Sequence, residues 1–420
     1  MKKIIVFVSA AGLFAAAITA SHAQVRVDRN GELVSANNNP TTRVTVGDVP
    51  FGWSAYSTGA AGGLGTSYQV GSSANAYGLR YENEQGGTDP ASTTAYPGGH
   101  SVIFGGATGV GTYGFQQDIV STPGKIYWMN GSMRQQSSYS ATATMRAGLE
   151  NTALNIGGAS MSQNGLAGTT VGKNGFVASV VATGTSIHAY MGIDASASNA
   201  INYYADGIRV WEFDPTPNAA LVNGNFATTK NLSNWGTLKP SNVTETPFRE
   251  SIVGQGWIPM GDKFGNNAEY LVDSTGPSGA KAQWIDSSIA IGRTYLLQKV
   301  YPGYFGTYSL SASVLQANAA ADVRIGIDPT GGLDPLSSSV VWASSIAALN
   351  TWTSMSLTGI NSYSANGISV WLAGGSSTYS AAGAAKFANI SLTVVPEPGS
   401  MLALGSGLVG LFGLTLRRRS

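Results

Sequence analysis

The side chains that carry most enzyme chemistry are scarce in this sequence. Its 420 residues include no cysteine, and only His100 and His188 lie beyond the first 23 residues. Cysteine nucleophiles, thiolate metal sites and disulfide scaffolds are therefore excluded. A serine triad needs a histidine base beside its nucleophile, and neither histidine lies near a nucleophile motif. We expect a protein that is not an enzyme.

Glycoside hydrolysis is the alternative that the composition leaves open. It needs two placed carboxylates, and Glu82 and Glu84 alternate on one face of an expected strand. Because the chain has 22 acidic residues, such a pair also arises by chance. A buried pair of carboxylates in a cleft would distinguish a hydrolase from the other hypotheses.

Aromatic rings offer a different chemistry, because a flat ring stacks on the apolar face of a sugar. The chain has 9 Trp and 18 Tyr. Candidate glycan contacts in loop-like stretches are Tyr77, Tyr81, Trp257, Tyr270 and Trp284. For each ring the competing interpretation is ordinary core packing, and the sequence leaves both open.

Charge is low and balanced. Lys and Arg total 23, Asp and Glu total 22, and the formal net charge is +1, so nothing draws the chain to nucleic acid. Charged residues make up 11% of the sequence and apolar residues 43%, with 55 glycines. This composition indicates a folded, β-rich and turn-rich extracellular protein with a Ser/Thr/Asn/Gly surface.

The first 23 residues have the pattern of a signal peptide. Two lysines precede an apolar run from Ile4 to Ala20, and small residues stand at Ser21 and Ala23. A charged start, an apolar helix and a small-residue site predict export and cleavage before Gln24. The competing interpretation is a retained membrane anchor.

The C-terminal end has the pattern of a membrane tail. Residues 400–416 are uncharged and mostly apolar, and Arg417, Arg418 and Arg419 follow them. Seventeen residues are at the short end of the range for a transmembrane helix. The arginines would stay in the cytoplasm, which predicts a body outside and a tail tip inside.

Pro396, Glu397 and Pro398 precede this apolar segment. The tripeptide, the apolar helix and the arginine cluster together resemble the PEP-CTERM sorting signal. The resemblance implies processing by an exosortase in the inner membrane of a Gram-negative bacterium that makes exopolysaccharide. The protein would then pass to the cell surface or the extracellular matrix. A plain single-pass anchor is the competing interpretation.

The body between the two ends contains an internal repeat. Segments recur in the same order in both halves: 117–134 with 298–315, 145–150 with 323–328, 176–180 with 352–356, 187–192 with 368–374, and 205–211 with 387–393. The prolines of 215–220 mark a linker. The expected organisation is a signal peptide 1–23, domains 24–214 and 221–394 around the linker, and a sorting signal 395–420.

Alternation of apolar and polar residues, as in 308–314, predicts strands throughout the body. The fold class that we expect is all-β, with two tandem antiparallel jelly-roll β-sandwiches between a signal helix and a transmembrane helix. The motifs resemble the galactose-binding-like jelly roll of carbohydrate-binding modules. The matching segments are 223–226 with Trp235, 308–312 and 204–208.

That resemblance implies a calcium ion that ties the first strand to the last. Calcium takes six to eight oxygen ligands, several of them carboxylates. In the first half the matching residues are Glu32 and Asp206; in the second, Asn223 and Asn225 face Asn389, which brings no charge. We expect any calcium in the first half. The competing interpretation is that Asp206 simply ends a strand.

The leading functional hypothesis is a non-catalytic surface protein that binds, or is embedded in, extracellular polysaccharide. The second hypothesis is a self-associating structural or adhesive protein without a glycan site. The third is the hydrolase. The expected partners are the exosortase, the polysaccharide and, before processing, the membrane.

Overall fold

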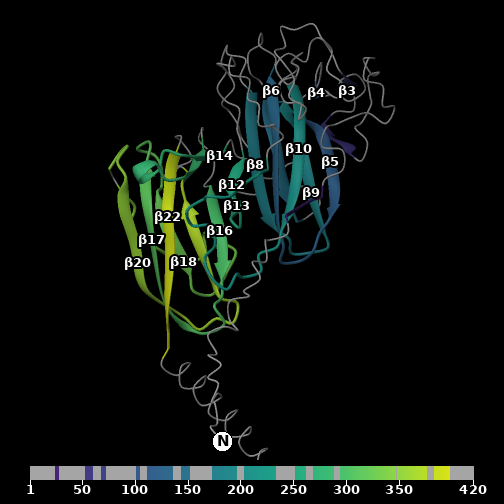
Figure 1. Ribbon diagram of the computed structural model, residues 1–420. Coiled ribbons are helices and arrows are strands. Elements are labelled where there is room, and N and C mark those ends of the chain that lie inside the picture. Colours follow the sequence, from purple (N-terminus) through teal and green to yellow (C-terminus); the bar gives the residue numbers. More distant parts are fainter. Residues whose placement is uncertain are drawn as a thin grey trace, which may run out of the picture.

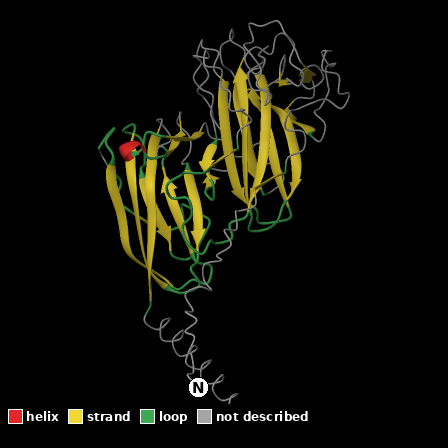
Figure 2. Ribbon diagram, in the orientation of Figure 1, coloured by secondary structure: helices red, strands yellow, loops and turns green. Residues whose placement is uncertain are grey.

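A computed structural model of the protein describes residues 24–27, 53–59, 68–71, 101–104, 111–135, 143–151, 173–195, 203–232, 251–261, 268–287, 294–346, 348–375 and 383–397. The predicted signal helix and C-terminal helix lie outside these ranges. Within them the regular structure consists of strands and one short 3-10 helix, Pro277–Gly279. The predicted all-β class is confirmed for this part of the chain (Figures 1 and 2).

The first half of the molecule contains two antiparallel sheets. Its strands are β1 (Gln24–Arg26), β2 (Ser54–Gly59), β3 (Tyr68–Gly71), β4 (Ser101–Phe104), β5 (Gly111–Val120), β6 (Ile126–Gln135), β7 (Ala143–Glu150), β8 (Lys173–Val181), β9 (Ser186–Ala195) and β10 (Tyr203–Phe213). One sheet has the order β3-β4-β10-β6-β8, with β1 also paired to β10, and the other has the order β2-β5-β9-β7. Met129 of β6 and Leu149 of β7 are buried between the sheets, so the half is a sandwich.

The second half is built in the same way. Its strands are β11 (Thr229–Asn231), β12 (Ile252–Gly254), β13 (Ile258–Met260), β14 (Ala268–Asp273), β15 (Ala282–Ser287), β16 (Tyr295–Val300), β17 (Gly306–Gln316), β18 (Arg324–Asp328), β19 (Val341–Trp342), β20 (Thr353–Ser362), β21 (Ile368–Ala373) and β22 (Gly383–Pro396). The two large sheets have the orders β14-β15-β22-β17-β20 and β13-β16-β21-β18-β19.

The strand orders of the two halves correspond one to one. The order β3-β4-β10-β6-β8 maps onto β14-β15-β22-β17-β20, and β2-β5-β9-β7 maps onto β13-β16-β21-β18. In both halves, consecutive strands from β4 and from β15 onward alternate between the two sheets, with β19 as an added short strand. The pairing of the strands confirms the internal repeat that the sequence predicts.

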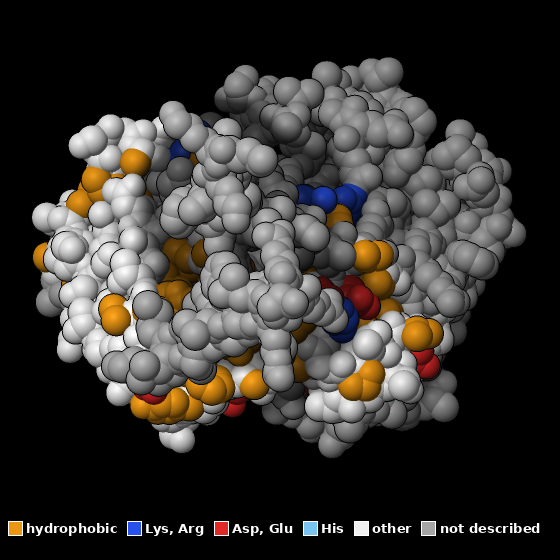
Figure 3. Space-filling model, turned by 60° about the horizontal axis from the view of Figure 1, so that its bottom comes forward, with side chains coloured by type: hydrophobic (Ala, Val, Ile, Leu, Met, Phe, Trp, Pro, Cys, Tyr) orange, Lys and Arg blue, Asp and Glu red, His pale blue; other side chains and the backbone are white. Residues whose placement is uncertain are grey.

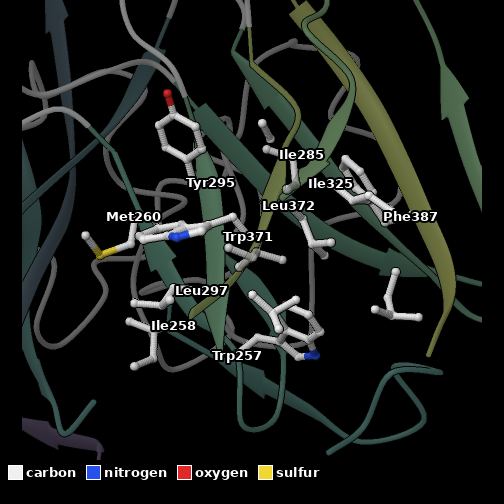
Figure 4. Packing of buried hydrophobic residues seen from close by; sticks show 14 of the residues in the cluster. Trp257, Ile258, Met260, Ile285, Tyr295, Leu297, Ile325, Trp371, Leu372 and Phe387 are labelled. Atoms are coloured by element: carbon white, nitrogen blue, oxygen red, sulfur yellow. The ribbon is translucent and has the colours of Figure 1, made fainter. Parts of the chain in front are cut away.

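The core of the second sandwich follows from the alternation along its strands. In β17 the side chains of Tyr308, Leu310, Ala312 and Val314 are buried and those between them are half-buried, as the two-residue period of a strand requires. Figure 4 shows large residues of the buried cluster: Ile325, Leu372 and Phe387 lie on one side of β21, and Trp371 lies on the other side, packed against Tyr295.

The outer face of β6, β8 and β10 is covered by the second sandwich. One apolar cluster joins the second core to five residues of the first sandwich, namely Ile126, Trp128, Val177, Trp211 and Phe213. The rings of Trp128 and Tyr270 meet edge to face, with centroids 6.4 Å apart. The two sandwiches therefore share a buried apolar contact.

Polar contacts fix the same interface. The Ser179 hydroxyl donates to the Gly261 carbonyl at 2.7 Å and accepts from the Gly261 N–H at 2.8 Å. The Trp211 indole N–H donates to the Leu232 carbonyl at 3.0 Å. Because these bonds have directions, they set the angle between the sandwiches as well as holding them together.

The linker 215–220 lies against the second sandwich. The Asn218 N–H donates to the Lys299 carbonyl at 3.0 Å, and the Tyr301 N–H donates to the Asn218 carbonyl at 2.7 Å. Asn218 thereby forms a parallel bridge at the end of β16. The connection is thus attached to the second sandwich through its backbone.

Candidate functional site

The outer face of the sheet β14-β15-β22-β17-β20 carries an ordered array of hydroxyl groups. Its outward positions on β17, β20 and β22 include Thr307, Ser309, Ser311, Ser313, Ser354, Ser356, Ser391 and Thr393, named here the hydroxyl face. Ser391, Ser311 and Ser356 stand opposite one another across the three strands. All these side chains are exposed or half-buried.

Most hydroxyls of this face are available to a ligand. Thr307 donates to the Asn361 side-chain oxygen at 2.7 Å, and Thr393 donates to the Ser309 carbonyl at 3.5 Å. Among the residues that the structure describes, the other side chains of the face have no partner. A hydroxyl both donates and accepts, and strands set such groups about 4.8 Å apart across the sheet.

An aromatic and charged group adjoins the hydroxyl face. The Lys386 ammonium lies 4.8 Å from the centroid of the Trp284 ring and 2.8 Å from the Asp273 carboxylate. Burial opposes ionisation of Asp273, but hydrogen bonds from Lys386 and Thr275 hold the pKa of this carboxyl below its ordinary value. Lys386 therefore stays over one face of the Trp284 ring.

Trp352 is the second tryptophan at this end of the face. Its indole N–H donates to the Thr275 carbonyl at 3.3 Å, and its ring is half-buried just before β20 begins. In the described structure no cation covers this ring. Trp352 can thus offer an apolar surface beside Ser354 and Ser313.

The equivalent face of the first sandwich is different in chemistry and in surroundings. The repeat places Trp128 at the position of Ser309, and Trp211 at the position of Thr393. In the first sandwich these positions are apolar and lie under the second sandwich. In the second sandwich they bear hydroxyl groups, with Ser309 half-buried and Thr393 exposed.

The structure corrects two of the predicted glycan contacts. Trp257 and Tyr270 are both fully buried. The Trp257 ring packs against Phe226 with centroids 5.8 Å apart, and the Tyr270 hydroxyl donates to the Met260 carbonyl at 2.9 Å. A ring enclosed by core residues presents no face to a sugar, so the prediction was wrong for these two and core packing is the right interpretation.

The other predicted contacts have different outcomes. Trp284 is half-buried on the outer face, with Lys386 over its ring, and its contact with a glycan stays a prediction. Tyr77 and Tyr81 lie outside the described residues, as do Glu82 and Glu84, so the carboxylate pair of the hydrolase hypothesis also stays a prediction.

The residues of the predicted calcium site are placed in part. Glu32 lies outside the described ranges, and Asp206 lies in β10 beside a register shift. In the second half the Asn223 amide is engaged with Thr228, to which its oxygen and nitrogen are both bonded. Within the described residues no group of three or more acidic or histidine side chains could hold a metal ion.

Two titratable groups outside this face have structural partners. His188 of β9 lies 2.6 Å from the Asp118 carboxylate of β5. Asp328, the one fully buried carboxylate in the described part of the chain, accepts from the Thr330 N–H at 2.9 Å and from the Ser339 hydroxyl at 2.9 Å. Asp328 therefore anchors the loop that follows β18.

The hydroxyl face is the feature that the sequence patterns did not single out. Alternating serines in 308–314 predict a strand, and the structure confirms that strand as part of β17. The sequence does not show that β20 and β22 flank β17 and bring their own serines into register with it. Counting hydroxyls at alternate positions of each expected strand would have been the available signal.

The end of the second sandwich holds the start of the predicted sorting tripeptide. β22 ends at Pro396, and the Glu397 N–H donates to the Phe305 carbonyl at 3.2 Å. A hydrogen bond to the Glu397 carboxylate raises the pKa of the Tyr363 phenol above its ordinary value. Pro396 and Glu397 are thus attached to the folded body.

Residues 394–419 match the family described as the PEP-CTERM protein-sorting motif. The chain carries a PEP-CTERM motif at its C-terminus. The match covers the last residues of β22 and the tripeptide, the apolar segment and all three arginines after them. The PEP-CTERM motif indicates an exported protein that is sorted at a membrane. In the described residues no helix has the length and apolar character to cross a bilayer.

Comparisons of the whole chain with curated proteins and with solved structures give weaker similarity than the match of the sorting motif. No curated protein matches the chain. The N-terminal CBM22-1-CBM22-2 tandem domain of Xyn10C from Paenibacillus barcinonensis is 12% identical, with a TM-score of 0.24 over 90% of this chain and 100% of that one. A Paenibacillus xanthan lyase is 12% identical, with a TM-score of 0.20 over 70% of this chain and 24% of the lyase. The plant receptor-like kinase ANX2 is 9% identical, with a TM-score of 0.24 over 74% and 87%. Scores of this size do not establish a shared arrangement.

Proposed function

We propose that this protein is a non-catalytic cell-surface protein whose second sandwich binds neutral extracellular polysaccharide along the hydroxyl face. The observation that carries the proposal is the row Ser391, Ser311 and Ser356, which stands in register across three strands, with Ser391 and Ser356 exposed and Ser311 half-buried. Serine hydroxyls donate and accept as sugar hydroxyls do. Trp352 at the edge adds a ring for stacking.

The chemistry of the face favours an uncharged glycan. None of its residues is ionisable, so an acidic polysaccharide would gain no ion pair on it. The charged group beside the face, Lys386 with Asp273, is already internally paired. A neutral chain of sugars lying across β22, β17 and β20 therefore fits best.

Affinity electrophoresis of the full chain in gels with neutral or acidic polysaccharide tests this proposal. We expect retardation by the neutral polymer and its loss in the double variant Ser311→Glu/Ser356→Glu, with affinity at least about tenfold weaker because both carboxylates must be desolvated. Thr185→Glu, in an exposed turn of the first sandwich, is the matched control. No retardation of the native chain, or equal loss in the control, refutes the proposed site.

A second candidate function is self-association, and the position of β20 favours it. β20 is an edge strand of ten residues with neither charge nor proline. Such an edge can pair with a second copy. Assembly that rises with protein concentration in the absence of glycan, and that Ser356→Lys abolishes, would support this candidate in place of the first.

We also propose that the PEP-CTERM tail spans the inner membrane of a Gram-negative cell until an exosortase processes it. The support is the apolar segment 400–416 and the three arginines beyond it. Deletion of residues 396–420 should leave an exported chain that is absent from the membrane fraction. Unchanged membrane placement and an unchanged final mass after the deletion would contradict the proposal.

A further inference from the structure

Exposed apolar side chains gather where β22 ends. Phe305 is 37% exposed, Tyr363 is 62% exposed and Val395 is 67% exposed; these three residues are named here the exit surface. The Phe305 and Tyr363 rings lie 6.3 Å apart. Figure 3, which brings this end of the molecule forward, shows hydrophobic side chains open to solvent there.

The neighbouring loop belongs to the same end of the sandwich. The Ser364 hydroxyl donates to the Thr330 carbonyl at 2.9 Å, which joins the loop after β20 to the loop after β18. That second loop carries Leu336, which is 55% exposed. Large exposed apolar residues are thus concentrated at one end of the second sandwich.

The length of chain after Glu397 limits how far this surface can be from a membrane. Glu397 is bonded through its N–H to Phe305, and three residues carry the chain to Ser400, where the apolar segment begins. Three residues span at most about 10 Å. If the segment is inserted, the exit surface is held at the level of the lipid headgroups.

The chemistry of the exit surface suits that level of a bilayer. Tyrosine and other aromatic rings are favoured at the membrane–water interface. The segments 301–305, 329–340, 363–367 and 395–397 contain no Lys or Arg, so attraction to anionic lipid is not what would hold them. Their only charged residues are Asp334 and Glu397. Zwitterionic headgroups, which carry a cation as well as a phosphate, suit an aromatic surface whose neighbouring charges are carboxylates.

We propose that the exit surface rests in the headgroup layer of a zwitterionic phospholipid bilayer while the PEP-CTERM tail is inserted. This inference rests on the proposed membrane insertion of residues 400–416. It adds a second, reversible contact between body and membrane, so that the sandwich stands on the bilayer and presents the tripeptide at its surface. Removal of the tail by processing would release this contact together with the anchor.

The absence of cysteine from the chain allows a clean test with single-cysteine reporters. Ala365→Cys lies two residues from Tyr363 and keeps the exit surface intact. Ser274→Cys follows Asp273, which is bonded to Lys386 near the start of β22. The stretch of β22 from Lys386 to Val395 separates the two reporter sites by about 30 Å. Each full-length variant is labelled with a fluorophore and reconstituted in phosphatidylcholine vesicles that contain a headgroup spin-label quencher.

We expect emission at Ala365→Cys to fall by about twofold and emission at Ser274→Cys to stay unchanged. Adding Phe305→Ser and Tyr363→Ser to the Ala365→Cys chain should weaken the quenching, with circular dichroism as the check on folding.

A chain that does not float with vesicles overturns both the proposed insertion and this inference. A chain that floats with Ala365→Cys unquenched, or with both reporters quenched alike, overturns the inference alone. Quenching replaced by cross-linking between chains would show that a second copy covers the surface.

Discussion

Lys386 makes two contacts on the outer face of the sheet β14-β15-β22-β17-β20, one with the Asp273 carboxylate and one with the Trp284 ring. Lys386 neutralises a half-buried carboxylate and also lies over the Trp284 ring. A cation over an aromatic face is attracted by the ring quadrupole. The pair therefore organises the edge of the candidate glycan surface.

Replacing Asp273 tests the contribution of the ion pair to the free energy of unfolding, because that contribution depends on pH. Because the folded-state pKa of Asp273 is lowered, its contribution to stability is present above the unfolded pKa of about 3.9 and lost as pH falls through the folded value. We expect Asp273→Asn to lower the free energy of unfolding by up to about 1 kcal/mol at pH 7.

Urea unfolding at pH 7 and pH 3 measures this effect, which should be smaller at the lower pH because that pH lies below the unfolded pKa of the carboxyl. Asp334→Asn is the control, since an amide oxygen can still accept from the Leu336 N–H as the Asp334 carboxylate does. Equal losses for Asp273→Asn at both pH values would rule out an electrostatic origin.

The segment 223–226, which opens the second sandwich, packs closely against β22, and this packing depends on its residue types. The Gly224 carbonyl accepts from the Ile390 N–H at 2.8 Å, and a Cβ on Gly224 would come within 2.1 Å of the Ile390 carbonyl oxygen. Phe226 has a positive φ of 53° and is fully buried. Burial against Trp257 offsets the strain of that conformation.

A methyl group at Gly224 should separate the opening segment from β22. We expect Gly224→Ala to lower the free energy of unfolding by about 1–3 kcal/mol, because the backbone must shift to admit the Cβ. Gly184→Ala is the control, since a Cβ there meets nothing within 4 Å. Equal stability of both variants in chemical denaturation would show that the close approach does not matter.

The two sandwiches share one strand order, but their equivalent faces have different surroundings in the molecule. Trp128 and Trp211 cover one sheet of the first sandwich and bury it against the second. The matching positions Ser309 and Thr393 leave the second sheet open to solvent. The first sandwich therefore loses this face to the interface, and the second keeps it free.

The interface predicts that the two sandwiches unfold together. Trp128→Ala should cost about 3–5 kcal/mol and split one calorimetric transition into two, because the shared contact is lost. Met129→Ala, the neighbouring residue on the opposite face of β6, should destabilise the first sandwich and leave the transitions coupled. Two separate transitions in the native protein would contradict a shared interface.

The all-β class, the internal repeat and the C-terminal sorting motif could all be predicted from the amino-acid sequence alone. Each depends on local pattern: alternation along strands, recurrence of segments, and a tripeptide followed by an apolar run and arginines. These signals need no knowledge of which strands are neighbours.

Tertiary structure decided which aromatic rings are buried and which polar side chains share a face. Trp257 and Tyr270 lie in glycine-rich, loop-like sequence, yet the sheets enclose them. Ser311, Ser356 and Ser391 are far apart in sequence and become one row when β20, β17 and β22 pair. Burial and pairing are properties of contacts between distant segments, and for that reason local pattern could not predict the candidate site.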